Sequence, residues 1–293
     1  MEKKPVIISL FDGMSCGQIS LNTFLKGNYT YYASEIEESS IIVTQHNFPK
    51  TIQIGDVRDI GILDSNVFLL LGGSPCTDLS LMGQMKGMNT DTLEQYLELK
   101  HSRFEFKGQS YLFWEYARIK KESNPKYFLL ENVIMNKKWQ DIISNELGVE
   151  PIKINSRLLT AQNRDRLYWT NIPNVTVPKD KKIMLSNIIP GASGCGSRGR
   201  KNKITGKYVP FFTIRPDGKS NCIVTQRNMT QRVIFPNGYQ RYLTIEEAEM
   251  LQTVPVGYTN VDGISKTDRY KMIGNGWTID VISHILSFIN YEK

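Results

Sequence analysis

Near-continuous apolar runs in the first half of the chain most constrain the fold that it can adopt. The segments "VIISLF" (residues 6–11), "VFLLLGG" (67–73) and "KYFLLENV" (126–133) lack the polar alternation of a strand with one face in water. Such runs are typical of parallel strands that are covered on both faces. Stretches with helical periodicity alternate with them, at 17–25, 37–47 and 110–123. This alternation predicts a doubly wound α/β fold with a mostly parallel, Rossmann-like sheet.

The composition and periodicity of the sequence change from about residue 173. Residues 190–207, "PGASGCGSRGRKNKITGK", are Gly-rich and basic and predict a flexible loop. Two short strands are predicted after this loop, "YVPFFTI" (208–214) and "CIVTQ" (222–226). These features indicate a small, irregular domain at residues 173–240.

Helical periodicity returns in the last fifty residues. "TIEEAEMLQTV" (244–254) predicts a helix with Thr244 as its N-cap, and "GNGWTIDVISHILSFI" (274–289) predicts another. We therefore expect one main domain formed by residues 1–172 and 241–293, which the small domain interrupts.

The charge of the chain is unevenly distributed. The 293 residues carry a net charge of +7, yet residues 183–245 hold ten Lys or Arg and a single acid, Asp217. That segment carries +9, which leaves −2 for the remainder. A segment almost free of acids predicts a polyanionic partner, and nucleic acid is the usual one.

Cysteine usage and hydropathy exclude several other classes. The four cysteines (Cys16, Cys76, Cys195 and Cys222) have no CxxC spacing and there are only three histidines, which argues against a metal site or a disulfide framework. No apolar stretch approaches the ~18 residues of a membrane span, and the N-terminus lacks a signal-peptide pattern. We expect a soluble protein of the cytoplasm.

Polar residues and glycines gather where the predicted strands end. "LFDGMSCG" (10–17) turns sharply from strand to helix, Glu35 closes the next strand, and Asp56 follows a third. Ligands of doubly wound sheets bind at this edge, and an acid about twenty residues after the glycine turn can bind a ribose. Each acid alone is consistent with a helix cap. Together they favour an adenosine ligand, and the absence of a P-loop leaves S-adenosylmethionine or NAD.

Cys76 lies at the end of another buried strand, in "GGSPCTDLS" (72–80). A lone cysteine is often a small buried hydrophobic residue, but Pro75 and the polar residues that follow favour a displayed thiol. A thiol ionises at a pKa of about 8.5, so a nucleophilic Cys76 requires surroundings that stabilise the thiolate.

Three further residues are candidates for the same edge of the sheet. Glu131, in "LLENV", ends the strand beside that of Cys76 and could protonate a ring nitrogen or cap a helix. Arg164 and Arg166, in "QNRDR", would point to one face of an extended strand. Two guanidinium groups there could hold a phosphate, a base carbonyl or a catalytic loop.

In their order along the chain, six motifs resemble those of the DNA (cytosine-5) methyltransferases. They are "SLFDGMSCG", "GGSPCTDLS", "ENV", "QNRDR", "RYLTIEEAEMLQTVP" and "MIGNGWTIDVI". The residues of the first two motifs are most similar to those of the animal de novo branch and its phage relatives. We therefore expect a phage or bacterial member, in which "GNGWTIDV" replaces the "GNAVPPPV" of typical bacterial enzymes.

The resemblance implies an S-adenosylmethionine-dependent methyltransferase fold, with S-adenosylhomocysteine as the product. The residues that it assigns to the cofactor are Phe11, Asp12, Gly13, Gly17, Glu35, Asp56, Val57, Pro75, Asn275 and Trp277. Glu35 would bind the ribose, and Asp56 with Val57 the adenine.

The resemblance also implies the catalytic chemistry. A cytosine flipped out of double-stranded DNA would receive Cys76 at carbon 6, while Glu131 protonates nitrogen 3. This addition is needed because carbon 5 is a poor nucleophile until the ring becomes electron-rich. Arg166 would contact the cytosine carbonyl, and Arg164 the catalytic loop or the backbone.

Residues 173–240 occupy the position of the target-recognition domain. The residues that we expect to contact DNA are Ser80, Arg198, Arg200, Lys201, Lys203, Arg215, Gln226, Arg227 and Asn228. A cognate restriction endonuclease and a homo-oligomer are further partners that the resemblance allows. Residues 88–106 are longer than the family pattern and have helical periodicity, which is consistent with an inserted lid or an oligomer contact.

Three alternatives remain. A catalytically silent regulator of the same fold normally lacks part of the set Cys76, Glu131, Arg164 and Arg166, whereas here the set is complete. A transfer-RNA cytosine methyltransferase fits the motifs less well than a DNA enzyme. An NAD dehydrogenase would not explain the "SPC", "ENV" and "QNRDR" motifs.

Overall fold

The computed structural model describes residues 4–61, 66–75, 88–201, 205–206, 208–225 and 231–291, with backbone alone at 197–201 and 208–212. By its internal contacts the chain divides into two compact units. The first unit consists of Met1–Ile154, Asp165–Val177 and Ser283–Lys293, and the second consists of Asn155–Arg164 and Pro178–Ile282.

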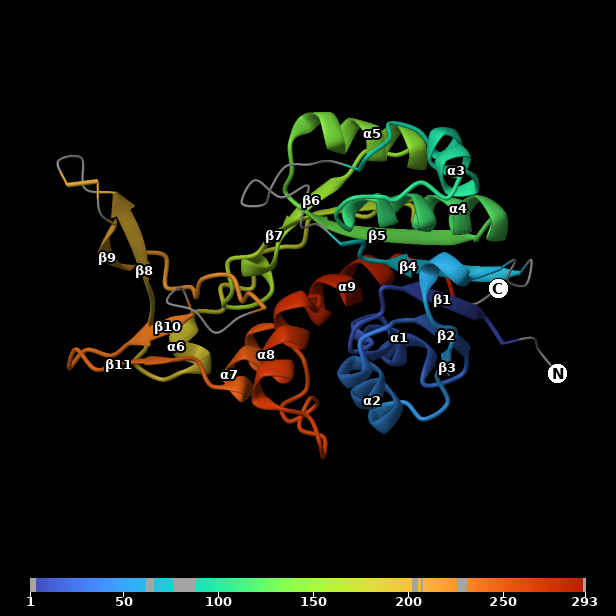
Figure 1. Ribbon diagram of the computed structural model, residues 1–293. Coiled ribbons are helices and arrows are strands. Elements are labelled where there is room, and N and C mark those ends of the chain that lie inside the picture. Colours follow the sequence, from blue (N-terminus) through green and yellow to red (C-terminus); the bar gives the residue numbers. More distant parts are fainter. Residues whose placement is uncertain are drawn as a thin grey trace. The chain divides into compact units, whose positions relative to one another are not determined.

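The first unit is built on a sheet with the strand order β3-β2-β1-β4-β5-β7-β6 (Figure 1). Its strands are β1 Val6–Leu10, β2 Thr30–Ser34, β3 Ile52–Gln53, β4 Val67–Gly72, β5 Tyr127–Val133, β6 Ile152–Asn155 and β7 Asp165–Thr170. The pairs β1–β2, β1–β4, β2–β3 and β4–β5 are parallel, whereas β7 runs antiparallel to β5. The predicted doubly wound, mostly parallel sheet is confirmed.

Helices cover both faces of this sheet. In Figure 1, α3, α4 and α5 lie over one face and α1 and α2 over the other. The bounds are α1 Cys16–Leu25, α2 Glu38–Asn47, the 3₁₀ turn η1 Val57–Asp59, α3 Leu93–His101, the 3₁₀ turn η2 Ser110–Leu112, α4 Phe113–Ser123 and α5 Lys137–Leu147. This two-sided cover explains why the central strands are apolar on both faces.

The core under α4 is tightly packed against the sheet. Trp114 and Tyr116 of α4 and Leu70 of β4 are fully buried. At Gly72, the last residue of β4, a Cβ atom would lie 2.6 Å from the ring of Tyr116. Glycine therefore lets β4 end directly beneath α4, at the edge where the motif with Cys76 begins.

The second unit combines a small antiparallel sheet with several helices. The strand order is β11-β10-β8-β9, with β8 Ser193–Lys201, β9 Tyr208–Ile214, β10 Arg232–Ile234 and β11 Gln240–Tyr242. Its helical segments are η3 Ser156–Leu158, α6 Leu185–Ile188, α7 Ile245–Leu251 and α8 Lys266–Asn275, and α9 Ile279–Leu286 leads back into the first unit. The predicted N-cap is confirmed: Thr244 and Glu247 form a capping box at the start of α7.

Two predictions about the second unit are wrong. Residues 193–201 of the glycine-rich segment predicted as a loop form β8, and residues 222–225 form no strand. At Gly194 of β8 a Cβ atom would lie 2.3 Å from the carbonyl oxygen of Lys219. Glycine here permits a close backbone approach between segments that are distant in sequence. A prediction from composition alone takes the same glycines as a sign of flexibility.

The two compact units also have other boundaries than the predicted domains. The first boundary, predicted at 172, lies near the division at Val177. Residues 241–282, however, are grouped with 178–240 and not with the sheet of the first unit. Helices α7 and α8 pack with one another, and Gln252, at the end of α7, donates to the carbonyl oxygen of Ile273 in α8. Arg164, just before β7, donates to the carbonyl oxygen of Gly274 in α8.

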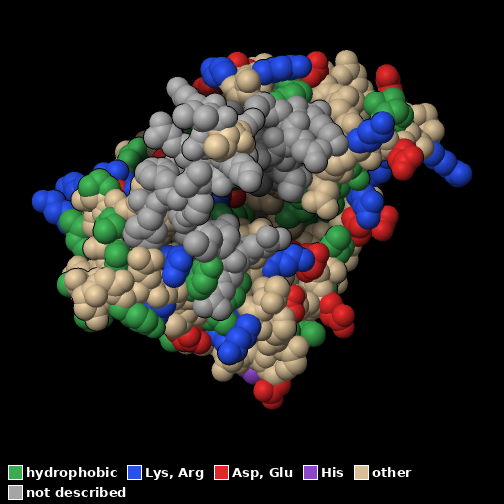
Figure 2. All heavy atoms as spheres, turned by 60° about the vertical axis from the view of Figure 1, so that its left-hand side comes forward, with side chains coloured by type: hydrophobic (Ala, Val, Ile, Leu, Met, Phe, Trp, Pro, Cys, Tyr) green, Lys and Arg blue, Asp and Glu red, His purple; other side chains and the backbone are tan. Residues whose placement is uncertain are grey.

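Charged side chains of both signs share the visible surface. On the face shown in Figure 2, Lys and Arg side chains are spread among Asp and Glu side chains. Of the helices in the described residues, none is long and apolar enough to cross a membrane.

Candidate active site

The turn after β1 has an unusual backbone. Phe11, Gly13 and Ser15 all have positive φ angles, of 57°, 58° and 61°. Two of these residues are not glycine, and such a conformation costs about 1–3 kcal/mol per residue unless the surroundings stabilise it. At Gly13 a Cβ atom would meet no atom within 4 Å, so the turn leaves open space there. Gly17 is buried in the first turn of α1.

Asp12 holds this turn from inside the protein. Its carboxylate accepts hydrogen bonds from the Tyr31 hydroxyl at 2.7 Å and from the Ser15 hydroxyl. Burial raises the pKa of Asp12 to about 6, against an ordinary value of 3.8. Both carboxylate oxygens thus have partners within the first unit, so the side chain of Asp12 supports the turn.

Glu35 connects the turn to the end of β2. Its Oε2 atom accepts the Gly13 N–H at 2.7 Å, and its Oε1 atom accepts the N–H groups of Ile36 and Glu37 at 2.7 and 2.9 Å. Each carboxylate oxygen has two lone pairs, so Glu35 retains acceptor capacity toward a hydroxyl group. Its half-buried position beside the open face of Gly13 suits a polar ligand.

Asp56 precedes the short turn η1 and caps it. Its Oδ1 atom accepts the Arg58 N–H at 2.9 Å, and its carboxylate forms a two-pronged ion pair with the Arg58 guanidinium. These hydrogen bonds lower the pKa of Asp56. Val57, the other residue expected at the adenine, is buried within the core cluster.

The segment that leads to Cys76 is anchored to β5. The Asn132 side-chain amide donates to the carbonyl and the hydroxyl oxygen of Ser74, both at 3.2 Å. Both residues are buried. Pro75 is described and half-buried, whereas Cys76 and Ser80 lie outside the described residues. Asn132 was missed as a site residue, although its place directly after Glu131 was a signal that could have found it.

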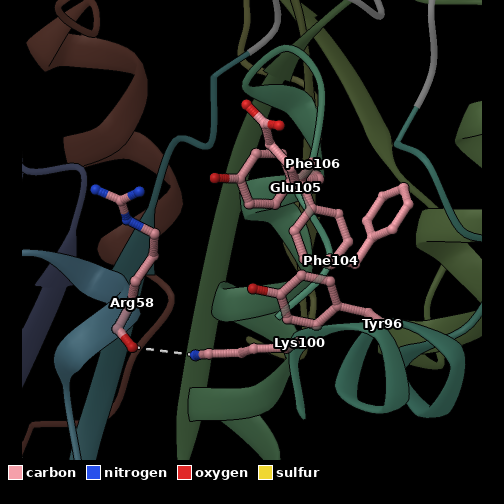
Figure 3. Close-up of a pocket in the computed structure, with 7 residues that line it drawn as sticks. Arg58, Tyr96, Lys100, Phe104, Glu105 and Phe106 are labelled. Atoms are coloured by element: carbon pink, nitrogen blue, oxygen red, sulfur yellow. Dashed lines mark hydrogen bonds between the residues drawn. The ribbon is translucent and has the colours of Figure 1, made fainter. Parts of the chain in front are cut away.

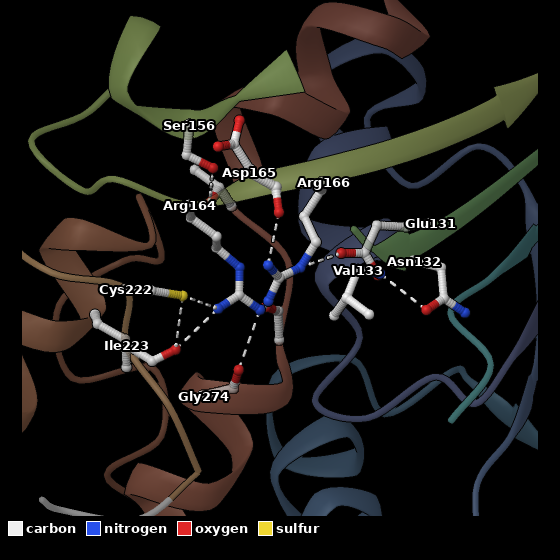
Figure 4. Close-up of polar contacts among 12 residues, drawn as sticks. Glu131, Asn132, Val133, Ser156, Arg164, Asp165, Arg166, Cys222, Ile223 and Gly274 are labelled. Atoms are coloured by element: carbon white, nitrogen blue, oxygen red, sulfur yellow. Dashed lines mark hydrogen bonds and ion pairs between the residues drawn. The ribbon is translucent and has the colours of Figure 1, made fainter. Parts of the chain in front are cut away.

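Glu131 and Arg166 form an ion pair at the same edge of the sheet (Figure 4). The Nε atom of Arg166 lies 2.8 Å from Oε1 of Glu131. Arg166 also donates to the carbonyl oxygen of Asp165. The pair joins β5 to the antiparallel strand β7, in which Val133 and Arg166 are register partners. An enclosed carboxyl that is oriented by a guanidinium can present a proton or an acceptor to a planar ring.

Arg164 has a different role within the second unit. Its guanidinium donates to the carbonyl oxygens of Ile223, Gly274 and Gly276 at 2.9 to 3.1 Å and contacts the Cys222 sulfur at 3.4 Å (Figure 4). Strand β7 begins at Asp165, so the expectation that Arg164 and Arg166 share one face of a strand is wrong. Arg164 clamps backbone segments of the second unit.

The other predicted residues of the second unit are only partly described. Asn275 is exposed at the end of α8, and Trp277 is buried. The Arg215 guanidinium forms an ion pair with Asp217 and donates a hydrogen bond to Asn221, so its donors already have partners within the protein. Arg198, Arg200 and Lys201 lie on β8 with their backbone alone described, and Lys203, Gln226, Arg227 and Asn228 lie outside the described residues.

Comparisons with known proteins agree with this arrangement. A family model described as C-5 cytosine-specific DNA methylase matches residues 6–187 and 158–290. The chain is 26% identical over 327 residues to the type II methyltransferase M1.ScrFI of Lactococcus lactis subsp. cremoris, covering 95% of this chain and 76% of that relative. It is also 26% identical over 346 residues to the type II methyltransferase M.NgoPII of Neisseria gonorrhoeae, covering 97% and 94%.

The fold is also found among solved structures. The structure of the Entamoeba histolytica methyltransferase EhMeth matches with a TM-score of 0.66 and 17% identity, covering 98% of both chains. The match of the family model over nearly the whole sequence, on a methyltransferase-type sheet, identifies the family. The chain belongs to the C-5 cytosine-specific DNA methylase family and is a cytosine-5 methyltransferase.

Proposed function

We propose that the protein transfers the methyl group of S-adenosylmethionine to carbon 5 of a flipped-out cytosine in double-stranded DNA, through a covalent adduct with Cys76. The observation that carries the proposal is the enclosed Glu131–Arg166 ion pair, beside the Asn132-anchored segment that precedes Cys76. Type II methyltransferases among the relatives support DNA as the substrate.

The proposed reaction proceeds by addition and elimination. The Cys76 thiolate adds its electron pair to carbon 6 of the ring, and Glu131 delivers a proton to nitrogen 3. The resulting enamine would be electron-rich at carbon 5 and would take the methyl group that bound S-adenosylmethionine supplies, with S-adenosylhomocysteine as the product. A base then removes the carbon-5 proton, the double bond reforms, the thiolate leaves and nitrogen 3 returns its proton.

The turn after β1 and the acids at the strand ends have the chemistry that the cofactor requires. Glu35 has acceptor capacity for ribose hydroxyls, and the open face of Gly13 leaves room for the donor. Asp56 would accept a hydrogen bond from the adenine amino group, and Val57 would contact the base. Phe11, Gly17, Pro75, Asn275 and Trp277 complete the proposed cofactor set. When bound, the cofactor supplies an electrophilic methyl group.

Target recognition is proposed for residues 173–240. The excess of Lys and Arg in this part of the chain supports phosphate contacts. The antiparallel pair of β8 and β9 carries Arg198, Arg200 and Lys201, and Lys203 follows β8. Gln226, Arg227 and Asn228 have side chains able to read base edges.

Methyl transfer from tritiated S-adenosylmethionine tests the proposal. Duplex DNA, poly(dI-dC) and total transfer RNA are offered to the purified protein and to its Cys76→Ala variant. We expect label in DNA with the unaltered protein and none with the variant. Label in transfer RNA alone would replace DNA by RNA as the substrate, and label that survives Cys76→Ala would refute the covalent route. Bisulfite sequencing of plasmid from an expressing host then gives the target site.

A further inference from the structure

Helix α3 lies within residues 88–106, the segment that the sequence led us to expect as longer than the family pattern, and the structure connects this helix to the proposed adenine site. The connection runs through Glu115, a carboxylate on α4 that is fully buried. Glu115 accepts hydrogen bonds from Lys100 Nζ at 2.5 Å and from Arg118 Nε at 2.7 Å. It also accepts the hydroxyl of Tyr96. A buried carboxylate is costly unless such partners compensate it, so these groups form one unit.

Both cations of this network also reach the backbone of η1. Lys100 Nζ donates to the carbonyl oxygen of Arg58 at 3.0 Å (Figure 3), and Arg118 Nη2 donates to that of Val57 at 3.2 Å. These carbonyls belong to the two residues that directly follow Asp56. Glu115 thereby holds two charged donors on the turn that carries the proposed adenine acceptor.

Aromatic packing keeps α3 in place above this network. The rings of Tyr96 and Phe106 lie 4.9 Å apart, and Phe106 stacks on Tyr111 of η2 at 4.7 Å. These residues line a pocket of about 310 Å³ together with Arg58, Lys100, Phe104 and Glu105 (Figure 3). Arg58, the ion-pair partner of Asp56, thus lines this pocket together with side chains of residues 96–106.

We propose that Lys100, Glu115 and Arg118 are positioning residues that fix η1, so that Asp56 and Val57 meet the adenine of the cofactor. This inference rests on the proposed function, because it takes S-adenosylmethionine as the ligand. A turn of three residues has few hydrogen bonds of its own. Displacements of about 1 Å in a binding group are enough to weaken recognition, so a turn held from outside by two charged donors binds better than a free one.

The test uses Lys100→Met, which keeps the aliphatic stem and removes one donor to η1. We expect the Kd for S-adenosylhomocysteine, measured by titration calorimetry, to rise about tenfold. The KM for S-adenosylmethionine should rise with it, while kcat at saturating cofactor stays within about twofold of the original value. Lys100→Arg restores a charged donor and should recover most of the affinity.

A second ligand distinguishes a positioning role of Lys100 at η1 from a general loss of rigidity in the cofactor site. S-inosylhomocysteine carries a carbonyl group where adenine has its amino group, so a well-placed Asp56 should reject it. The unaltered protein should prefer S-adenosylhomocysteine, and Lys100→Met should lose most of that preference. The matched control is Lys121→Met, which removes an exposed α3–α4 pair with Glu94, 3.6 Å long, that does not contact η1. This control should bind both ligands as the unaltered protein does.

Two outcomes would overturn the inference. Lys100→Met could retain full affinity, as the control Lys121→Met should, or it could lose affinity for both ligands by the same factor. Failure of the unaltered protein to bind S-adenosylhomocysteine would instead refute the proposed function. If Lys100→Met is poorly folded by thermal unfolding, Tyr96→Phe provides the same comparison, because it removes one hydrogen bond from Glu115 and leaves the charges. Tyr96→Phe should then lower the preference for S-adenosylhomocysteine, and an unchanged preference would overturn the inference.

Discussion

The Nε atom of Arg166 lies 2.8 Å from Oε1 of Glu131, and the two side chains are 15% and 11% exposed. The residues belong to neighbouring antiparallel strands, β7 and β5, so the sheet itself brings them together. An ion pair enclosed to this degree orients the carboxyl group, because both partners lose free rotation. It gives the proposed site a fixed acid at the edge where Cys76 follows β4.

Glu131→Gln should lower kcat for methyl transfer by at least about 100-fold, because the amide cannot protonate nitrogen 3 of the ring. The measurement is single-turnover transfer of tritiated methyl to duplex DNA. Binding of S-adenosylhomocysteine should change little. Lys153→Met is the control. It removes a more exposed ion pair, 3.7 Å long, with Asp165 at the start of β7, the strand that also carries Arg166. Equal losses in the two variants would contradict a catalytic role for Glu131.

Glu35→Gln should weaken cofactor binding by about tenfold or more, because it removes the negative charge at the proposed ribose site and disturbs the contact with Gly13. Titration calorimetry with S-adenosylhomocysteine measures the effect. Glu38→Gln, an exposed acid in the first turn of α2, should leave the affinity unchanged. Undiminished affinity in Glu35→Gln would show that the ribose binds elsewhere.

Asp12 should make stability depend on pH below neutrality. Its pKa is about 6 in the folded chain against 3.8 ordinarily, so the folded state binds the proton more tightly. The stability that Asp12 contributes is present at about pH 4 and is lost as the pH rises through 6, a change of about 3 kcal/mol.

Urea unfolding of the protein and of Asp12→Asn between pH 4 and 8 measures this dependence. The original protein should gain stability relative to the variant as the pH falls. A difference that is constant over this range, or that grows toward pH 8, would contradict the assignment.

Arg164→Met should destabilise the protein by about 3 kcal/mol or more, because two buried carbonyl groups and one half-buried carbonyl group lose a charged donor. Hydrogen exchange should accelerate at amides around residues 222–225 and 273–276. Lys181→Met removes an exposed ion pair with Asp280 in the same unit and should cost less than about 1 kcal/mol. Similar losses in the two variants would argue against the clamp role of Arg164.

Much of the sheet could be predicted because it depends on neighbouring residues. Apolar runs marked β1, β4 and β5, and helical periodicity marked α1, α2 and α4. The capping box at Thr244 was also readable, since its two residues lie three positions apart. The strand β8 was not, because its residue Gly194 serves a close approach to Lys219, a contact between segments far apart in the chain.

The sequence by itself determined the order of the motifs, the strand–helix alternation and therefore the family, because these are properties of short, contiguous stretches. Only the tertiary structure decided how the side chains are used. In the folded chain the carboxylate of Asp12 accepts a hydrogen bond from Tyr31, and Glu131 forms an ion pair with Arg166. Arg164 donates to backbone carbonyl groups of the second unit. These contacts depend on which distant segments become neighbours, and local sequence patterns contain no information on that choice.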